Sequence, residues 1–448
     1  MSFLSVGVGC GWNRVRRACL ILLCTGATLI AGDEPPEVVT ADVVRRLSER
    51  LRERHPEVRA LGHTATAERL NADGSRRWAD PDVMLGGALY RYADMARENG
   101  DLYYGVEQRL PILGKERAAR ALAASNAVAS GARLEARFAE LRRDLAVSLF
   151  DAATARMAAD LIAADVRWLE IQVRLGRSRV ASGGDPASMV LRLENELDRR
   201  RLDWTNALAR RVDGEIGVQR LLVGSGDPVG GFLLPPVAEA VPFGPVLVRF
   251  AERAEPEVLR REQDVGVASA TVEVTRRSQR PDVAVGVQSY HESATGTAAQ
   301  GMLTVTMSVP WFNRANYRRD LQRDRARLAS VEASVEDARQ AVRREVHRLV
   351  TQIDSARREA VLMRDVVLPR TRRLQESLEG LWTSGRVELR ELLDTRRQRV
   401  EAEMSEVQAT GEYWVAMSEL LLCCGLEDLE TVRELLAGGG SGIEGGTK

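Results

Sequence analysis

The chain has 448 residues, of which 29% are charged and 44% are hydrophobic, so it can bury a large core or divide into several domains. Its 64 basic and 64 acidic residues give a formal net charge of zero, and Lys occurs only at Lys115 and Lys448. The arginines are interspersed with Asp and Glu, which excludes the basic patch that a nucleic-acid-binding protein needs.

The first 31 residues have the features of a secretory signal peptide. Arg14, Arg16 and Arg17 precede an apolar stretch from Ala18 to Ala31, and polar residues follow at once. The stretch is shorter than the ~20 residues that a membrane-spanning helix needs, and no other segment approaches that length. We therefore expect an exported chain that no helix anchors in a membrane.

The cysteines do not form a disulfide framework. Three of the five lie within the signal peptide, and the mature chain keeps only Cys423 and Cys424, which follow an apolar run and are expected to be buried. Cys24 follows Leu23, where a lipoprotein signal has a small residue, so the sequence favours an N-terminus without lipid and leaves lipidation of Cys24 as the alternative. The four histidines are scattered, and we expect no bound metal and no cofactor.

Beyond the signal, the chain resembles itself at a spacing of 200 residues. Pro56-Glu57-Val58 returns as Pro256-Glu257-Val258, and Pro81-Asp82-Val83 returns as Pro281-Asp282-Val283. Each copy contains an amphipathic helical segment, then two short segments with the pattern of β-strands, and then a very long helical stretch. We predict a signal peptide at residues 1–31, a first repeat at 32–225, a Gly- and Pro-rich connector at 226–245, a second repeat at 246–437 and a disordered Gly-rich tail at 438–448.

Two short runs in each copy have the pattern of half-buried strands. From Leu303 to Val309 every second residue is apolar, and the residues between them are Thr or Ser. Similar runs lie at Val283–Val287, Val83–Arg91 and Leu102–Leu110. The runs have about nine residues, the length of a tilted strand that crosses a bilayer.

Aromatic residues lie in or beside these runs, as they do at the lipid interfaces of transmembrane barrels. They are Tyr90, Tyr92, Tyr103, Tyr104, Tyr290, Trp311 and Phe312. A soluble four-stranded sheet remains the alternative. Because closed barrels start at about eight strands, a membrane version needs strands from several chains.

The two longest segments are predicted to be helical rods, at about Lys115–Gly176 and Arg318–Gly385. Small and aliphatic residues recur along the second rod in alternating steps of three and four, so one narrow face needs partner helices. About sixty residues at 1.5 Å each reach about 90 Å. Pro369 is expected to bend the second rod or to mark a change of packing. A turn and another amphipathic helix follow each rod, which predicts a long helical hairpin in each copy.

This order of elements, and its doubling, resembles the TolC family of outer-membrane efflux proteins over about residues 40–425. The residues that carry the resemblance are Gln108–Lys115, Arg280–Val283, Val309–Arg314 and Gly385–Asp394. The form Leu-Pro-x-x-Gly-Lys at Leu110–Lys115 is most similar to members that serve heavy-metal exporters.

The resemblance implies a mostly α-helical fold with a small β part. Three chains would contribute four strands each to a shared twelve-stranded transmembrane β-barrel in the outer membrane of a Gram-negative-type cell, and their hairpins would form a trimeric α-helical tunnel in the periplasm. The implied partners are two further copies of the chain, a periplasmic adaptor, an inner-membrane pump reached through the adaptor, and membrane lipid. The duct would conduct passively, because the pump supplies the energy, so no enzymatic activity is expected.

The same resemblance implies a pore gate. Similar proteins have acidic rings a few positions past the second hairpin turn, and here the matching residues are Glu391 and Asp394. A spacing of three places both carboxylates on one face of a helix, where three copies would present rings that favour cations. The alternative is a solvated helix face with Arg390 and Arg396 as neighbours.

The hairpin tips are the implied contacts with the adaptor. Glycines in them allow sharp reversal and close backbone approach. The predicted contact residues are Gly176, Gly183, Gly184 and Asp185 in the first tip and Gly385 and Arg386 in the second. The alternative is that these residues only turn the chain.

Two other protein classes remain open. A periplasmic adaptor also has a signal and a long hairpin, but normally a single one flanked by strand-rich domains. A soluble coiled-coil scaffold would need no aromatic-edged strands. No phosphate-binding loop, His-Glu-x-x-His motif or nucleophile elbow indicates an enzyme. Metal ions, drugs and secreted proteins all remain open as cargo.

Overall fold

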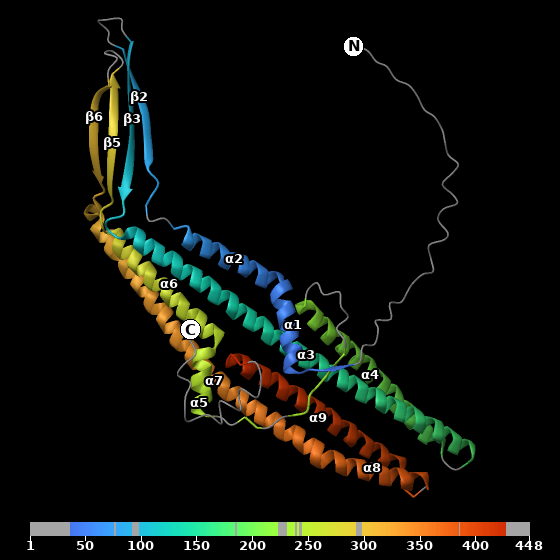
Figure 1. The fold of residues 1–448 in the computed structure, drawn as a ribbon. Coiled ribbons are helices and arrows are strands. Elements are labelled where there is room, and N and C mark those ends of the chain that lie inside the picture. The colour runs from blue at the N-terminus through green and yellow to red at the C-terminus, as the bar shows by residue number, and fades with distance from the viewer. Residues whose placement is uncertain are drawn as a thin grey trace, which may run out of the picture.

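A computed structural model describes residues 36–75, 78–91, 98–183, 186–222, 231–237, 240–241, 244–292, 298–384 and 386–426. The predicted signal peptide, with Cys24, and the Gly-rich tail lie outside these ranges. The molecule is elongated (Figure 1): a four-stranded sheet stands at one end, the tips of two helical hairpins lie at the other, and α1 and α5 lie beside the long helices between them.

Two helices, a strand pair and a long helical hairpin occur twice along the chain. In chain order they are β1 (Glu37–Val38), α1 (Ala41–Arg54), α2 (Pro56–Asp73), β2 (Asp82–Arg91), β3 (Glu98–Leu110), α3 (Lys115–Ala181), α4 (Ala187–Leu221), β4 (Phe232–Leu233), α5 (Pro245–Ala254), α6 (Pro256–Ser278), β5 (Val283–Glu292), β6 (Ala298–Met307), the 3-10 turn η1 (Pro310–Asn313), α7 (Arg314–Leu362), the π-helical turn η2 (Met363–Val367), α8 (Leu368–Thr383) and α9 (Leu389–Cys423).

The sheet has the strand order β2-β3-β5-β6, and all its pairs are antiparallel. Pairing of β3 with β5 joins the two repeats. Val83, Val106, Val287 and Leu303 lie opposite one another across the four strands and are 74%, 48%, 63% and 70% exposed. The alternation therefore produces a sheet with one exposed apolar face, and β6 ends at Met307, two residues before the end of the predicted run.

The junction between sheet and helices holds the two repeats together. Gly114 has a φ of 76°, a left-handed conformation that favours glycine, and turns the chain into α3. Lys115 Nζ lies 2.8 Å from Asp282 Oδ1, and Arg280 Nη1 donates to the Leu113 carbonyl at 2.8 Å. Residues of the motifs that carried the family resemblance thus contact each other at this junction.

The helical hairpins are confirmed, with one correction to the first. The prediction that Gly176 ends the rod is wrong, because α3 continues to Ala181 and has 67 residues, a length of about 100 Å. Gly176 is buried inside the helix, and a Cβ there would lie 3.2 Å from Leu193 Cδ1 on α4. This glycine allows two helices to approach closely and does not break the helix.

The change predicted at Pro369 takes the form of a π-helical turn. Pro369 lies at the second position of α8, directly after η2. Proline lacks a backbone N–H and its ring clashes with the preceding helical turn, so the α-helical hydrogen-bond pattern cannot pass through it. The second rod is therefore formed by α7, η2 and α8 in succession.

The middle of the molecule contains two elements that the sequence pattern did not predict. The two-residue strands β1 and β4 pair in parallel and add Val39, Phe232 and Leu234 to the core around α1 and α3. Trp414 on α9 stacks on Phe150 with ring centroids 5.7 Å apart, and its Nε1 donates to the Pro235 carbonyl at 2.9 Å. The second repeat is thereby attached to the first and to the connector.

Candidate functional site

The two hairpin tips share one apolar core. In the first hairpin it includes Val166, Leu169, Val173, Leu193 and Leu197, and in the second Leu378, Trp382, Leu389, Leu392 and Leu393. Arg179, near the end of α3, reaches across to α8. Its Nη1 donates to the Trp382 carbonyl at 3.0 Å, and its guanidinium lies 4.9 Å from the Trp382 ring centroid. The tips therefore form a single packed end of the molecule.

Behind this core, a buried carboxylate joins three helices. Asp165 on α3, with a side chain only 3% exposed, has Oδ1 at 2.7 Å from Arg396 Nε on α9 and Oδ2 at 2.8 Å from Arg200 Nε on α4. The Arg396 guanidinium also lies 5.0 Å from the Trp168 ring centroid. Because a buried charge is costly without a partner, this arrangement fixes the two hairpins relative to each other.

The predicted tip residues do not all lie in the turns. Gly183 does, with a φ of 75° and open space around its Cα, whereas Gly176 lies about two helical turns earlier, inside α3. Arg386 is exposed in the second turn, and its backbone N–H donates to the Leu381 carbonyl at 2.9 Å. Gly184, Asp185 and Gly385 lie outside the described residues.

The predicted acidic pair lies on the first two turns of α9, and both side chains are exposed. Asp394 has Arg390 Nε at 3.8 Å and Arg397 Nη1 at 3.5 Å. Arg396, which the alternative placed beside the pair, is turned inward to Asp165. The neighbours of the acidic pair are thus Arg390 and Arg397, and Asp394 is the more compensated of the two carboxylates.

A groove of about 850 Å³ lies between the tips. Its lining includes Arg192 and Arg199 from α4 and Arg390 and Arg397 from α9. Arg397 also binds Glu196, with Nη2 at 2.6 Å from Oε2, and its guanidinium holds the pKa of Glu196 below its ordinary value. At the tip end, the apolar core therefore lies beneath a groove whose lining contains several arginines together with acidic residues.

Sequence reasoning missed the buried group Asp165–Arg200–Arg396. A signal for it was present, since Asp165 stands among Ile162, Val166 and Leu169 on the buried side of α3. A carboxylate in an apolar stripe predicts a paired buried charge. Its partners on α4 and α9, 231 residues away for Arg396, could not be read from local spacing.

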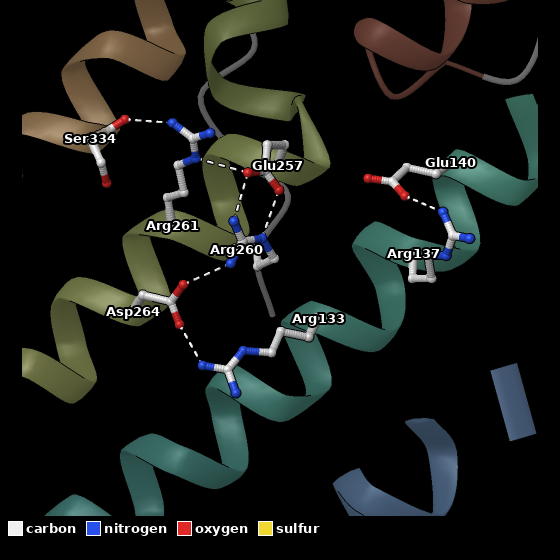
Figure 2. Close-up of polar contacts among 8 residues, drawn as sticks. All are labelled: Arg133, Arg137, Glu140, Glu257, Arg260, Arg261, Asp264 and Ser334. Atoms are coloured by element: carbon white, nitrogen blue, oxygen red, sulfur yellow. Dashed lines mark hydrogen bonds and ion pairs between the residues drawn. The ribbon is translucent and has the colours of Figure 1, made fainter. Parts of the chain in front are cut away.

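Nearer the sheet, an ionic layer ties α3 to α6 (Figure 2). Arg133 Nη2 lies 2.8 Å from Asp264 Oδ1, and Arg260 bridges Asp264 and Glu257 at 2.8 and 2.6 Å. Arg261 binds Glu257 and donates to a backbone carbonyl of α7. The pKa of Glu257 is consequently held below its ordinary value, chiefly by its hydrogen bond to Arg260.

One carboxylate beside this layer, that of Glu255, has among the described residues no arginine ion pair of the kind that Glu257 and Asp264 have. Glu255, at the corner between α5 and α6, lines a cavity of about 260 Å³, and its buried Oε2 has no hydrogen-bond partner. Burial raises the pKa of Glu255 to about 7, although a hydrogen bond with the Cys423 thiol and the nearby Arg143 act in the opposite direction. Burial also raises the pKa of Cys423 and, to about 12, that of Cys424.

No membrane-crossing helix and no metal centre is found in the part of the chain that the structure describes. None of its helices combines enough length with enough apolar character to span a bilayer. Within the same residues, no group of three or more His, Cys, Asp or Glu side chains could hold a metal ion.

Comparison with known proteins places both repeats in one family. A family model described as outer membrane efflux protein matches residues 47–224 and 247–425. A search of curated proteins gives no match.

Solved structures share the fold at low sequence identity. A membrane protein from Pseudomonas aeruginosa is 17% identical, with a TM-score of 0.75 over 87% of this chain and 91% of that one. The CmeC outer membrane channel of Campylobacter jejuni is 10% identical, with a TM-score of 0.74 over 88% of each chain. The MtrE outer membrane channel of Neisseria gonorrhoeae, in an open state, is 16% identical, with a TM-score of 0.73 over 86% of this chain and 89% of that one.

Proposed function

The chain belongs to the outer membrane efflux protein family, and from this membership we propose how its parts perform efflux. It is an outer-membrane channel of a tripartite efflux system, in which an adaptor and a pump are its partners, and it is not an enzyme. The alternatives of a periplasmic adaptor or a soluble scaffold are not favoured. The repeats proposed at residues 32–225 and 246–437 are supported by the two segments that the family model matches.

We propose that three copies form the channel. The observation that carries this proposal is the sheet: among the described strands, β2 and β6 each have a single paired neighbour, and the apolar face is exposed across all four strands. Unpaired strand edges cannot face lipid, so β6 of one copy must pair with β2 of the next until the barrel closes. The protein is expected in the outer-membrane fraction and should migrate as a trimer in unheated electrophoresis. A water-soluble monomer would contradict the proposal.

Val305→Arg tests which face of the sheet meets lipid. Val305 is 67% exposed and is the third residue from the end of β6, away from the middle of the strand. An arginine on the lipid face costs about 2–4 kcal/mol at the bilayer midplane and less near the interface, so we expect a loss of about 1–2 kcal/mol. Urea titration of folding into vesicles measures it. The control Thr304→Arg, on the opposite face, should cost less. Equal losses would contradict the assignment of the lipid face, and a larger loss for Thr304→Arg would reverse it.

We further propose that Glu391 and Asp394 line the narrow end of the pore. Their exposure on one face of α9 supports this role, and the groove between the tips is a suitable adaptor contact, with Gly183 and Arg386 exposed beside it. Because Gly176 is buried, we replace it in the proposed contact by the turn residues that follow α3. Gly184, Asp185 and Gly385 remain part of the proposed tips.

Replacing Glu391 and Asp394 together by alanine should change conduction. Two rings of carboxylates attract cations and narrow the pore, so the double variant should show a conductance about twofold or more above wild type and a weaker preference for cations. Single-channel recording in planar bilayers measures both. Glu401→Ala removes an exposed carboxylate ten residues further along α9 and should leave conduction unchanged. Equal conductance of the double variant and wild type would remove the pair from the gate.

A further inference from the structure

The turn η1 presents the most exposed large apolar side chain among those the structure describes. Phe312 is 85% exposed and its neighbour Trp311 is 55% exposed, whereas Pro310 is buried and holds the turn against the protein. Exposing two adjacent aromatic rings to water is unfavourable, since each buries a large apolar area when covered. We therefore expect that something other than the core of this chain covers the two aromatic rings.

The position of η1 relates it to the apolar face of the sheet. It follows β6 after two residues, and the exposed side chains of Leu303, Val305 and Met307 lead along that strand toward it. A tilted strand of 10 residues spans about 25 Å, close to the height of the apolar band of a membrane barrel. The aromatic turn thus lies at the level where this band ends on the side of the helices (Figure 1).

The residues that follow the turn carry positive charge. Arg314, Arg318 and Arg319 open α7, are exposed, and have no ion-pair partner among the described residues. The nearest acidic residue of α7, Asp320, is bound by Arg323 with Oδ1 at 3.0 Å from Nη1. Several other arginines of this end have carboxylate partners, namely Arg109, Arg276, Arg277, Arg323 and Arg327. The three exposed guanidinium groups of Arg314, Arg318 and Arg319 therefore add uncompensated positive charge directly after the aromatic turn.

We propose that η1 and the start of α7 bind the periplasmic leaflet of the membrane, with Trp311 and Phe312 at the boundary of headgroups and acyl chains and the three arginines on anionic phospholipid headgroups. This inference rests on the proposed insertion of the sheet. Aromatic rings favour the membrane interface, and Arg binds phosphate oxygens bidentately. Continuity with the apolar sheet face and the uncompensated positive charge together favour anionic lipid over a protein partner.

Tryptophan quenching by brominated lipid tests the aromatic contact. In a Trp78→Phe background, Trp311 is the only tryptophan of residues 36–426 near the sheet, since Trp168 and Trp382 lie at the tips and the other two on α4 and α9. The trimer is reconstituted in vesicles of phosphatidylcholine brominated at the start of the acyl chains. We expect quenching of one component of the emission and its loss in Trp311→Phe, which retains an aromatic ring.

Lipid selectivity tests the charge. Vesicles of phosphatidylcholine with 30% spin-labelled phosphatidylglycerol report the association of anionic lipid with the trimer. An arginine near a charged membrane surface changes such association by about fivefold, so Arg314→Gln/Arg318→Gln/Arg319→Gln should weaken it several-fold. Arg325→Gln, an exposed arginine about 10 Å further along α7, is the matched control and should have little effect.

The outcomes separate this inference from the proposed function. If bromolipid does not quench Trp311, for instance because a neighbouring subunit covers the turn, the proposed lipid contact is wrong. Equal association of phosphatidylglycerol with wild type and with the triple variant would also contradict the proposal. Either outcome counts against the lipid contact only if the trimer inserts and conducts in the same vesicles. Failure of wild type to insert or conduct would instead contradict the proposed channel itself.

Discussion

Replacing Asp165 by alanine is expected to destabilise the folded protein by about 3–5 kcal/mol, the largest loss that we expect from a single substitution in the helical region. Asp165 lies between Arg200 and Arg396, and its side chain is 3% exposed. Without it, two guanidinium groups remain largely buried next to each other with no carboxylate between them. The repulsion and lost hydrogen bond act on α3, α4 and α9 at once, so both hairpins should be affected.

Urea unfolding of the detergent-solubilised trimer, followed by circular dichroism at fixed protein concentration, measures the loss for Asp165→Ala. Trp168 packs against Arg396, so its fluorescence provides a second, local signal. The control is Asp203→Ala, which removes a 44% exposed partner of Arg200 at 3.4 Å and should cost under about 1 kcal/mol. Equal losses in the two variants would show that Asp165 has no special role in joining the hairpins.

Much of the fold could be predicted because its signals repeat over many residues. The stripe along α7 and the alternation in β6 each extend over several turns or residue pairs, so a single exception does not hide them. The strands β1 and β4 have two residues each, too few to show a period. Gly176 was misplaced because glycine has two uses, at a turn and at a close helix contact, and only the presence of α4 beside it distinguishes them.

Only those features of the candidate site that depend on residues close together in the sequence could be predicted. Glu391 and Asp394 are three residues apart on one helix, so their common face follows from helical geometry alone. The inward direction of Arg396 depends on Asp165, and the partner of Arg397 is Glu196 on another hairpin. Contacts between segments about 200 residues apart are decided by packing, which a single sequence does not display. The charge around the acidic pair therefore required the structure.

Glu255→Gln is expected to stabilise the protein by about 3 kcal/mol above pH 7 and to have little effect near pH 4.5. Burial raises the pKa of Glu255 from an ordinary value of 4.5 to about 7, so the folded state binds a proton more tightly than the unfolded state. Between these two pH values stability falls as the pH rises, because the folded state must either keep the proton or bury a charge. A pKa change of one corresponds to about 1.4 kcal/mol, which sets the size of the effect.

The surroundings of Glu255 explain why glutamine should relieve this cost. The cavity at its corner is also lined by Glu140, Glu257, Glu345 and Glu419, so ionised Glu255 faces further carboxylates, and among the residues that line the cavity Arg143 alone carries an unlike charge. The amide keeps the shape of the side chain and cannot ionise. Thermal unfolding of wild type and Glu255→Gln in detergent, measured at several pH values between 4.5 and 8, gives the difference directly.

Glu257→Gln provides the control of opposite sign for this pH dependence. The hydrogen bond to Arg260 lowers the pKa of Glu257, so its contribution to stability is present above the unfolded pKa and is lost as the pH falls through the folded value. Glu257→Gln should therefore destabilise at pH 8 and have less effect in acid, whereas Glu255→Gln stabilises at pH 8. The two residues are two positions apart at the start of α6, so a general effect of pH on this region would shift both variants in the same direction. Parallel curves would refute a separate titration of Glu255.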